Sequence, residues 1–451
     1  MPSSTAASSE AIATPVSEIR HGRTRLNQAA ELLQSILSQT RVPADRIMDQ
    51  YFRERRQMGS KDRAFAAETV YGCLRRKGEL EALAGPLLPA DLPDETRSYW
   101  LVAAYLLKYS GWSARALADA DFKGDADALV TRVRSTKPEA LPFSARINMP
   151  EWLAGKLVGQ FGETEAITLS DALNHAAQVG LRVNTLRANR DALAAQLAEE
   201  GHPCEPMKYS PVGLQRAKRG PLFNTEAFQQ GLFELQDEGS QLLAYMTEAA
   251  PKQKVVDFCA GAGGKTLALA AMMQNTGLLY ACDISAGRLE RLKPRLARAG
   301  AYNAQSFAIR DEHDPALKKL EASMDAVLVD APCSGTGTLR RNPDIKWRPI
   351  DLELLAMTQA SILEAAAKLA KSGGRLVYAT CSLLQEENEA ITAAFLAGHP
   401  EFEVIPASEI LARQGVSAPE GLKPDGALRL LPHLHGTDGF YALAMRRRVP
   451  A

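Results

Sequence analysis

Cysteines are few in this sequence, and none of them form a close pair. A disulfide scaffold needs a dense set of cysteines, and a zinc site needs short paired spacings. Neither pattern is present, so we expect a reducing compartment and no bound metal. The six cysteines are Cys73, Cys204, Cys259, Cys282, Cys333 and Cys381.

Long apolar segments and targeting signals are also missing. No apolar run approaches the roughly 20 residues needed to span a bilayer. Residues 1–22 are rich in Ser, Ala and Thr, and they lack both the apolar core of a secretory signal and the arginine-rich pattern of a transit peptide. We therefore expect a disordered tail, no membrane association and a cytoplasmic location.

Neither sign of charge is in excess, because 53 Lys and Arg residues balance 53 Asp and Glu residues. Any polyanionic partner must therefore be recognised through local basic clusters and not through the overall charge. A content of 46% hydrophobic and 24% charged residues is ordinary for a globular protein. A chain of 451 residues is too long for one core, so we expect about three domains.

Residues 255–266, VVDFCAGAGGKT, have the pattern of a strand, a glycine turn and the start of a helix. Free backbone N–H groups and the positive end of the helix dipole face outward at such a junction. Glycines also let a ligand approach the main chain closely. This segment therefore predicts a cofactor-binding loop.

Two common cofactor motifs fail in this loop. A phosphate-binding P-loop needs a glycine where the chain has Cys259, and a dinucleotide fingerprint needs one where the chain has Thr266. The remaining interpretations are the S-adenosylmethionine loop of a Rossmann-like methyltransferase and a plain strand-to-helix turn.

Carboxylates follow the next three predicted strands. Asp283 follows the strand at residues 278–280, Asp311 follows residues 304–309, and Asp330 ends the strand at 326–329. Ligands in an open parallel sheet bind at the carboxyl ends of the strands. We therefore expect the three side chains at one edge, with Asp283 placed to accept hydrogen bonds from a ribose.

Cysteines follow two strands at the same predicted edge. Cys333 lies after the fourth strand, and Cys381 lies after a fifth strand at residues 375–379. Together with the surrounding motifs, the chain resembles the RNA 5-methylcytosine methyltransferase family typified by RsmB and the NOL/NOP/Sun proteins. The motifs are DAPCSGTG at residues 330–337, TCS at 380–382, QDEGS at 236–240, NPDIKW at 342–347 and DGF at 438–440.

The resemblance implies roles for individual residues. Cys381 would be the nucleophile that adds to carbon 6 of cytosine, and Cys333 would assist proton removal and product release. Asp330 would bind the cytosine edge with support from Lys265, and Asp311 would bind the adenine amino group of S-adenosylmethionine. The implied cofactor-binding residues are Cys259, Ala260, Gly261, Ala262, Gly263, Gly264, Lys265, Asp283, Asp311 and Asp330.

One departure from the family lies in the cofactor loop. The family usually has Ala-Ala-Pro-Gly-Gly-Lys there, and this chain has Gly261 and Ala262 in place of the second alanine and the proline. Gly263, Gly264 and Lys265 are retained. We expect altered loop rigidity with binding retained, so cofactor affinity is the property that this departure affects.

Three domains follow the tail in our interpretation. Residues 23–146 have helical periodicity and resemble a NusB-like RNA-binding domain, residues 147–250 resemble a small α/β RNA-recognition-like module, and residues 251–451 form the Rossmann-like catalytic domain. Basic residues crowd the segment from Arg53 to Lys77. These side chains either bind RNA or simply form the solvent-exposed faces of helices. Further basic residues follow the Pro-Cys loop: Arg340, Arg341, Lys346 and Arg348. Trp347 lies among them and is either a core residue or a platform on which an RNA base stacks.

The expected function is methylation of cytosine C5 in RNA by a monomeric enzyme. The NusB-like segment favours 16S ribosomal RNA as the substrate, by family analogy alone. Transfer RNA is the alternative substrate. Two functions of other classes stay open, a nucleotide hydrolase that uses Lys265 and Thr266 and a non-catalytic RNA-binding assembly factor.

Overall fold

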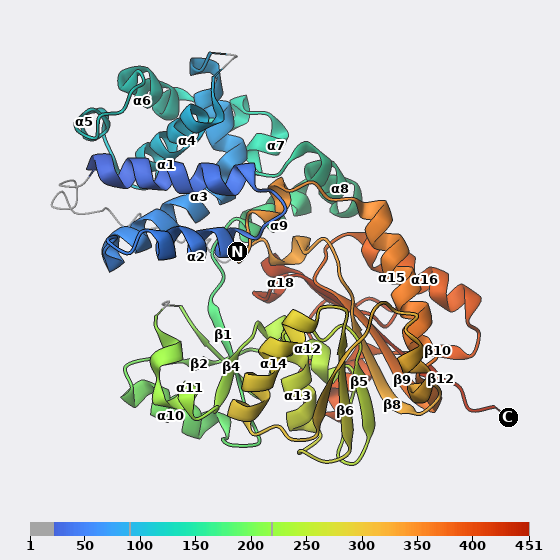
Figure 1. Cartoon of the computed structure of the whole chain (residues 1–451). Helices are drawn as coiled ribbons and strands as arrows, with labels where there is room; N and C mark the ends of the chain where they lie inside the picture. The colour runs from blue at the N-terminus through green and yellow to red at the C-terminus, as the bar shows by residue number, and fades with distance from the viewer. Residues whose placement is uncertain (1–21, 90–91, 218–219, 451) are drawn as a thin grey trace, which may run out of the picture. The chain divides into compact units, whose positions relative to one another are not determined.

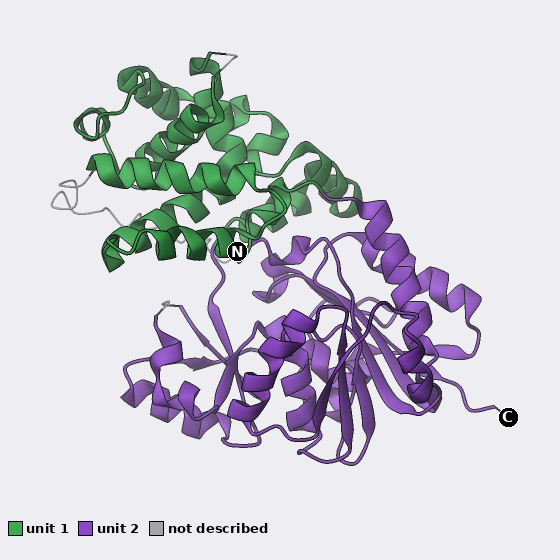
Figure 2. Cartoon of the chain, in the orientation of Figure 1, with its two compact units in different colours: residues 1–175, 342–349 green, residues 176–341, 350–451 purple. Residues whose placement is uncertain are grey.

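The computed structural model describes residues 22–89, 92–217 and 220–450. Two compact units divide the chain, one comprising residues 1–175 with 342–349 and the other residues 176–341 with 350–451 (Figure 2). The tail expected at residues 1–22 lies outside the described residues except for Gly22, the first residue of a helix. The domain boundaries expected at residues 146 and 250 stay a prediction. No helix in the described part of the chain is long and apolar enough to cross a membrane.

The first unit is helical, as the periodicity predicts. The apolar spacing from Leu26 to Leu37 lies in α1, and the spacing from Phe65 to Arg76 lies in α3. α1 packs against both α3 and α4 around a core that includes Leu26, Leu33 and Leu74. The helices are α1 (Gly22–Ser38), α2 (Ala44–Glu54), α3 (Ser60–Ala84), α4 (Asp94–Tyr109), α5 (Ala114–Asp119), α6 (Ala126–Ser135), α7 (Phe143–Arg146), α8 (Glu151–Phe161) and α9 (Glu163–Leu173).

Residues 342–349 leave the catalytic part of the chain and pack into the helical unit. Lys346 is only 1% exposed, and its Nζ donates to the Arg75 carbonyl at 3.0 Å, the Asn148 carbonyl at 2.7 Å and Asn174 Oδ1 at 2.7 Å. Burial, followed by the nearby arginines, lowers the pKa of Lys346 well below its usual value. Trp347 donates from Nε1 to the Leu74 carbonyl at 2.6 Å and packs against the helical core. These contacts favour packing over base stacking for Trp347, and they remove Lys346 from the set of exposed basic residues.

The second unit begins with a small antiparallel sheet of strand order β2-β3-β1-β4. The sequence pattern predicts a strand at residues 180–184 and a helix at residues 190–200. The inner strand β1 covers residues 180–183 of that strand, and α10 covers residues 190–199 of that helix. α10 packs its Leu193 and Leu197 on this sheet. The elements are β1 (Val179–Val183), α10 (Arg190–Glu199), β2 (Glu205–Pro206), β3 (Gly213–Arg216), α11 (Glu226–Gln229) and β4 (Phe233–Leu235).

The large sheet has the strand order β10-β12-β9-β8-β5-β6-β7, with β11 paired to β12 (Figure 1). Strands β5 to β9 run parallel, and β12, β10 and β11 pair antiparallel. This arrangement confirms the predicted Rossmann-like α/β fold. The strands are β5 (Lys254–Asp257), β6 (Leu278–Asp283), β7 (Ala304–Ala308), β8 (Met324–Asp330), β9 (Ala370–Thr380), β10 (Phe402–Ile405), β11 (Leu428–Leu430) and β12 (Phe440–Arg447).

Helices cover both faces of the large sheet, which explains why its parallel strands are almost continuously apolar. Val255 and Leu328 point into a core with α12, α13, α14 and α17, and Val256 and Val327 point into a second core with α15 and α16. The helices of this unit that follow the small sheet are α12 (Glu238–Tyr245), α13 (Gly264–Met272), α14 (Ala286–Ala299), α15 (Leu352–Ala367), α16 (Glu389–Gly398), α17 (Ala407–Arg413) and α18 (Pro432–His435).

The strand order places a topological switch point beside β5. The chain passes from β5 to β6 and β7 on one side and then crosses to β8 on the other side. The connections therefore diverge between β5 and β8, and they leave a crevice at the carboxyl ends of these strands. The glycine loop after β5 and Asp330 at the end of β8 both lie at this crevice.

Candidate active site

The loop between β5 and α13 requires glycine at position 263. Gly263 has a φ of +86°, and a Cβ atom built there would lie 2.1 Å from Leu292 Cδ1. The left-handed backbone favours glycine, and a larger residue would displace the Leu292 side chain of α14. Gly261 also has a positive φ of +56°, but a Cβ at that position would meet open space. The turn is therefore tight on its protein side and open on the other side.

Side chains from several elements hold this loop in place. Asp283 accepts hydrogen bonds from the Gly261 N–H at 2.8 Å and the Ser285 N–H at 2.7 Å. Arg295 donates to the Ala262 carbonyl at 2.5 Å, and Arg182 donates to the Gly264 carbonyl at 2.7 Å. Asp283 thus holds the loop in shape and also lines the cavity above it.

Asp257, the last residue of β5, links this strand to α13. Its Oδ2 accepts a hydrogen bond from the Thr266 hydroxyl at 2.7 Å, and its Oδ1 has no partner among the described residues. Complete burial raises the pKa of Asp257 to about 7, although the hydrogen bond from Thr266 opposes that shift. Strand β5 and helix α13 are therefore joined by a buried carboxyl group whose pKa lies near neutrality.

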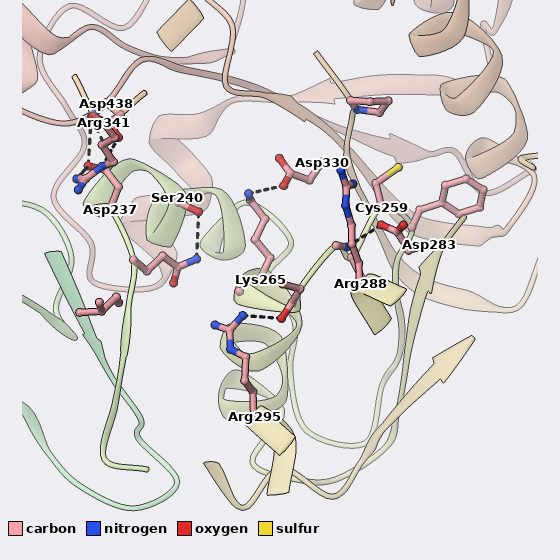
Figure 3. Close-up of a pocket in the computed structure, with 18 of the residues that line it drawn as sticks. Asp237, Ser240, Cys259, Lys265, Asp283, Arg288, Arg295, Asp330, Arg341 and Asp438 are labelled. Atoms are coloured by element: carbon pink, nitrogen blue, oxygen red, sulfur yellow. Dashed lines mark hydrogen bonds and ion pairs between the residues drawn. The ribbon is translucent and has the colours of Figure 1, made fainter. Parts of the chain in front are cut away.

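A cavity of about 810 Å³ opens over the loop (Figure 3). Most of the predicted cofactor residues line it. Gly263 and Asp311 are not among the lining residues; Asp311 is exposed and accepts a hydrogen bond from the His313 N–H at 2.9 Å. The predicted residues that do line the cavity are Cys259, Ala260, Gly261, Ala262, Gly264, Lys265, Asp283 and Asp330.

Sequence reasoning missed several residues of this cavity. Glu312 lines it in place of its neighbour Asp311, and Arg288 reaches it from α14. Val179 and Gly180 of the small sheet line it as well. The acidic pair after the third predicted strand was a usable signal for Glu312, whereas nothing local in the sequence indicates the contribution of the small sheet.

Lys265 and Asp330 form an ion pair inside the cavity, with Nζ and Oδ2 2.6 Å apart (Figure 3). Their side chains are 10% and 30% exposed, so water screens the pair only in part. Burial lowers the pKa of Lys265, but the charges of Asp330, Asp257 and Cys381 outweigh burial and raise it overall. Lys265 therefore remains a cation beside the Asp330 carboxylate.

The two predicted catalytic cysteines lie together. Cys333 Sγ and Cys381 Sγ are 3.4 Å apart, although their loops are 48 residues apart in sequence. The shared hydrogen bond, followed by burial, raises the pKa of Cys333 well above its usual value. Either sulfur can donate the hydrogen bond that joins the pair. Neither cysteine lines the main cavity, but Asp330 and Pro332 do.

Three motifs that are distant in sequence meet at another side of the cavity. Arg341 donates to Asp438 Oδ2 at 2.6 Å and to Asp237 Oδ2 at 2.9 Å (Figure 3). Burial and the adjacent Asp237 raise the pKa of Asp438 to about 7. Arg340 donates to the carbonyls of Gly436 and Thr437. The arginines after the Pro-Cys loop, which we expected at an RNA surface, therefore bind other parts of the chain.

Family models match two parts of the chain. Residues 244–446 match the model of the 16S rRNA methyltransferase RsmB/F, and residues 149–222 match the ferredoxin-like domain of RsmF/B-like methyltransferases. The second match covers part of the segment that we expected to be a small α/β module.

Similar proteins extend over nearly the whole chain. The probable ribosomal RNA small subunit methyltransferase B of Synechocystis is 30% identical over 91% of this chain and 96% of its own length. The corresponding Bacillus subtilis protein is 30% identical over 87% of this chain and 92% of its own. The crystal structure of PH0851 has a TM-score of 0.77 and 26% identity, covering 93% of this chain and 98% of that one. The predicted resemblance is confirmed, and the chain belongs to the RsmB/F family of ribosomal RNA methyltransferases.

Proposed function

We propose that this protein transfers a methyl group from S-adenosylmethionine to carbon 5 of a cytosine in 16S ribosomal RNA. The reaction proceeds through a covalent bond between Cys381 and carbon 6 of the base. The observation that carries this proposal is the 3.4 Å separation of the Cys333 and Cys381 sulfurs beside a cavity that contains Asp330 and Lys265. Two adjacent thiols, one to attack the base and one to assist proton removal, suit a covalent mechanism.

The cavity fits S-adenosylmethionine in size and chemistry. A volume of about 810 Å³ is in the range of small-molecule sites. Phe258, Ile284 and Ile309 supply apolar walls for an adenine ring, and Asp283 supplies a buried acceptor for ribose hydroxyls. The open side of Gly261 leaves the backbone accessible. Bound S-adenosylmethionine supplies an electrophilic methyl group to this site.

Carbon 5 of cytosine is a weak nucleophile, and Cys381 overcomes this weakness. Its sulfur forms a bond to carbon 6, and the ring electrons shift toward carbon 5, which then accepts the methyl group. Afterwards a base must accept the proton on carbon 5, and the bond from sulfur to carbon 6 breaks, so that its electron pair returns to the Cys381 sulfur. Cys333, whose sulfur lies 3.4 Å from the Cys381 sulfur, assists this proton removal and the release of the product.

Asp330 and Lys265 act on the base and not on the methyl group. The Asp330 carboxylate accepts hydrogen bonds from the cytosine edge and favours its protonated form, which draws electrons from carbon 6. Lys265 holds the carboxylate through the ion pair at 2.6 Å. A target base must also be unstacked to reach this site, which favours loops or assembly intermediates of the RNA as substrates.

The substrate assignment is tested by sequencing bisulfite-treated RNA from a strain that lacks this protein. One cytosine of 16S ribosomal RNA should become fully convertible by bisulfite, because 5-methylcytosine resists conversion. A strain that carries the gene on a plasmid serves as the control. Unchanged 16S conversion together with a newly convertible cytosine in transfer RNA would instead support the alternative substrate.

The cofactor assignment predicts that Asp283→Ala weakens S-adenosylmethionine binding. The variant loses the ribose acceptor and the hydrogen bond to the Gly261 N–H, at a cost of roughly 1–3 kcal/mol. Calorimetric titration should therefore show an affinity that is about 5 to 150 times weaker. Asp191→Ala, a change at an exposed carboxylate on α10, should bind like the wild type. Wild-type affinity in Asp283→Ala would overturn the cofactor site.

RNA binding by the helical unit is a further part of the proposal. Within the basic segment, several side chains have internal partners: Arg55 pairs with Glu31, Lys77 pairs with Glu81, and Arg63 donates to the Met58 carbonyl. Arg53, Arg56 and Lys61 are exposed. These three residues are the ones that we assign to phosphate contacts.

The triple variant Arg53→Gln, Arg56→Gln and Lys61→Gln should bind RNA more weakly. Its affinity should also depend less on salt, because fewer counterions are released when fewer phosphates are neutralised. The matched control replaces three basic residues that are exposed elsewhere in the unit, Arg115, Arg134 and Lys137, by Gln. Filter binding over a salt series measures both slopes. Equal slopes for the two triple variants would leave the segment as a solvated surface.

A further inference from the structure

The buried carboxylate of Glu387 connects the two loops that carry Cys333 and Cys381. Glu387 is 0% exposed, and both of its oxygens accept hydrogen bonds. Oε1 accepts from the Ser334 backbone N–H at 2.7 Å and from Gln359 Nε2 at 3.0 Å. Oε2 accepts from the Ser334 hydroxyl at 2.5 Å and from the Ser382 hydroxyl. One side chain thus binds four donors.

The donors belong to the residues that follow the two cysteines. Ser334 comes directly after Cys333, and Ser382 comes directly after Cys381. The two serine hydroxyls lie 3.1 Å apart, and each lies 3.2 Å from the Thr336 hydroxyl. Thr336 also accepts from the Leu383 N–H at 3.0 Å. The cluster therefore joins the Pro-Cys loop after β8 to the Thr-Cys loop after β9.

Asn388 extends the same support to the other side of Cys381. Its Oδ1 accepts from the Thr380 hydroxyl at 2.5 Å, and its Nδ2 donates to the Ser382 carbonyl at 3.0 Å. Gln359 of α15 donates in turn to the Pro332 carbonyl at 2.9 Å. Residues on both sides of each cysteine are consequently tied to one buried polar cluster.

We propose that Glu387 is a positioning residue that holds the sulfur atoms of Cys333 and Cys381 at a separation suited to catalysis. Its relevance to methyl transfer rests on the proposed function, but its effect on the distance between the sulfurs does not. Glu387 is fully buried and both of its oxygens are held by protein donors, so it acts on the reaction only through the cysteine loops.

The chemistry of the cluster explains why a carboxylate occupies this position. An ionised carboxylate only accepts hydrogen bonds and offers about four lone-pair sites, which matches the four donors. A glutamine has one acceptor oxygen, and its NH₂ group would face two donors unless the serine hydroxyls rotate. An alanine would leave all four donors without this acceptor in a buried site, where unsatisfied polar groups are costly. The negative charge of Glu387 also contributes to raising the pKa of Cys333, after the hydrogen bond to Cys381 and burial.

A trivalent arsenical tests the sulfur separation without RNA or S-adenosylmethionine. Phenylarsine oxide reacts with two neighbouring thiols, forms two arsenic–sulfur bonds and releases one water, so no oxidant is consumed. The full-length wild type should bind one equivalent at the Cys333–Cys381 pair, and Cys333→Ala should lose that site. Glu387→Ala should bind about tenfold more weakly or worse, because loops without the carboxylate no longer hold both sulfurs in place.

Glu389→Ala is the matched control. Glu389 lies two residues further along the chain and pairs with Arg429 at 2.6 Å, away from both cysteine loops. This variant should bind the arsenical like the wild type. Glu387→Gln keeps the size of the side chain and one acceptor, so it should fall between wild type and alanine. It also provides the test if Glu387→Ala does not fold, which thermal unfolding and S-adenosylmethionine binding would reveal.

Steady-state methylation separates positioning from a general loss of structure. Glu387→Ala should lower kcat while the affinity for S-adenosylmethionine stays within about twofold of the wild type, and Glu387→Gln should restore part of kcat. Wild-type arsenical affinity and wild-type kcat in the glutamate variants would overturn the proposal. If the wild type itself does not methylate RNA, the proposed function fails, and the arsenical result still decides the role of Glu387.

Discussion

Cys333→Ala protein mixed with substrate RNA and S-adenosylmethionine should accumulate a covalent protein–RNA adduct that survives denaturing electrophoresis. Cys381→Ala protein should form no adduct and should transfer no methyl group. Without the Cys381 sulfur, no bond to carbon 6 forms and carbon 5 stays unreactive. Without Cys333, attack and methyl transfer still proceed, but the departing sulfur lacks the thiol that now lies 3.4 Å away.

The structure supports this prediction, because the two sulfurs lie 3.4 Å apart. The interaction with Cys381 and burial raise the pKa of Cys333 well above its usual value. Cys204→Ala is a suitable control, because Cys204 packs against the core of the small sheet and belongs to neither cysteine loop. It should turn over without adduct accumulation. Adducts in Cys381→Ala and none in Cys333→Ala would show that the two roles are reversed.

Asp330→Asn should slow methyl transfer by about 10²- to 10⁴-fold, the range that a positioned acid or base contributes. The amide lacks the charge that favours the protonated form of cytosine. It also leaves Lys265 without its counter-ion in a site where the lysine side chain is only 10% exposed. Single-turnover rates at saturating RNA and S-adenosylmethionine measure the step directly.

The control for this variant lies on the same strand. Asp325 is near the amino end of β8 and pairs with Lys371, whereas Asp330 ends the strand at the cavity. Asp325→Asn should keep the wild-type rate. A thermal unfolding transition like that of the wild type in Asp330→Asn would separate a chemical defect from a folding defect. A single-turnover rate equal to that of the wild type would remove Asp330 from the mechanism.

Local patterns accounted for most of the catalytic sheet. The parallel strands are buried on both faces, so residues such as 255–256 and 326–329 form short apolar runs that stand out from the helices between them. Each run ends at the carboxyl edge of the sheet, and the side chains that follow it gather there. Asp283 and Asp330 thus line one cavity as expected, and Cys333 and Cys381 lie next to each other.

Patterns of one or two residues were less informative where neighbours have similar chemistry. Asp311 and Glu312 both follow the third strand and both carry carboxylates, but only Glu312 lines the cavity. The direction in which each side chain points depends on the backbone of the loop, and composition does not specify it. The exposure of the basic residues after the Pro-Cys loop was equally hard to predict. Lys346 is buried, but its sequence context does not distinguish it from an exposed lysine.

By itself, the sequence determined the fold class, the glycine loop and the pair of cysteines. Each of these can be identified from residues that are neighbours in the sequence. Only the tertiary structure decided which charged groups are used inside the protein. Arg341 pairs with Asp237 and Asp438, which are 104 and 97 residues away in the sequence. Glu387 accepts hydrogen bonds from nearby Ser382 and from Ser334, which is 53 residues away. Such contacts depend on how strands and loops pack against one another, and a buried carboxylate is recognisable only when the donors around it are known.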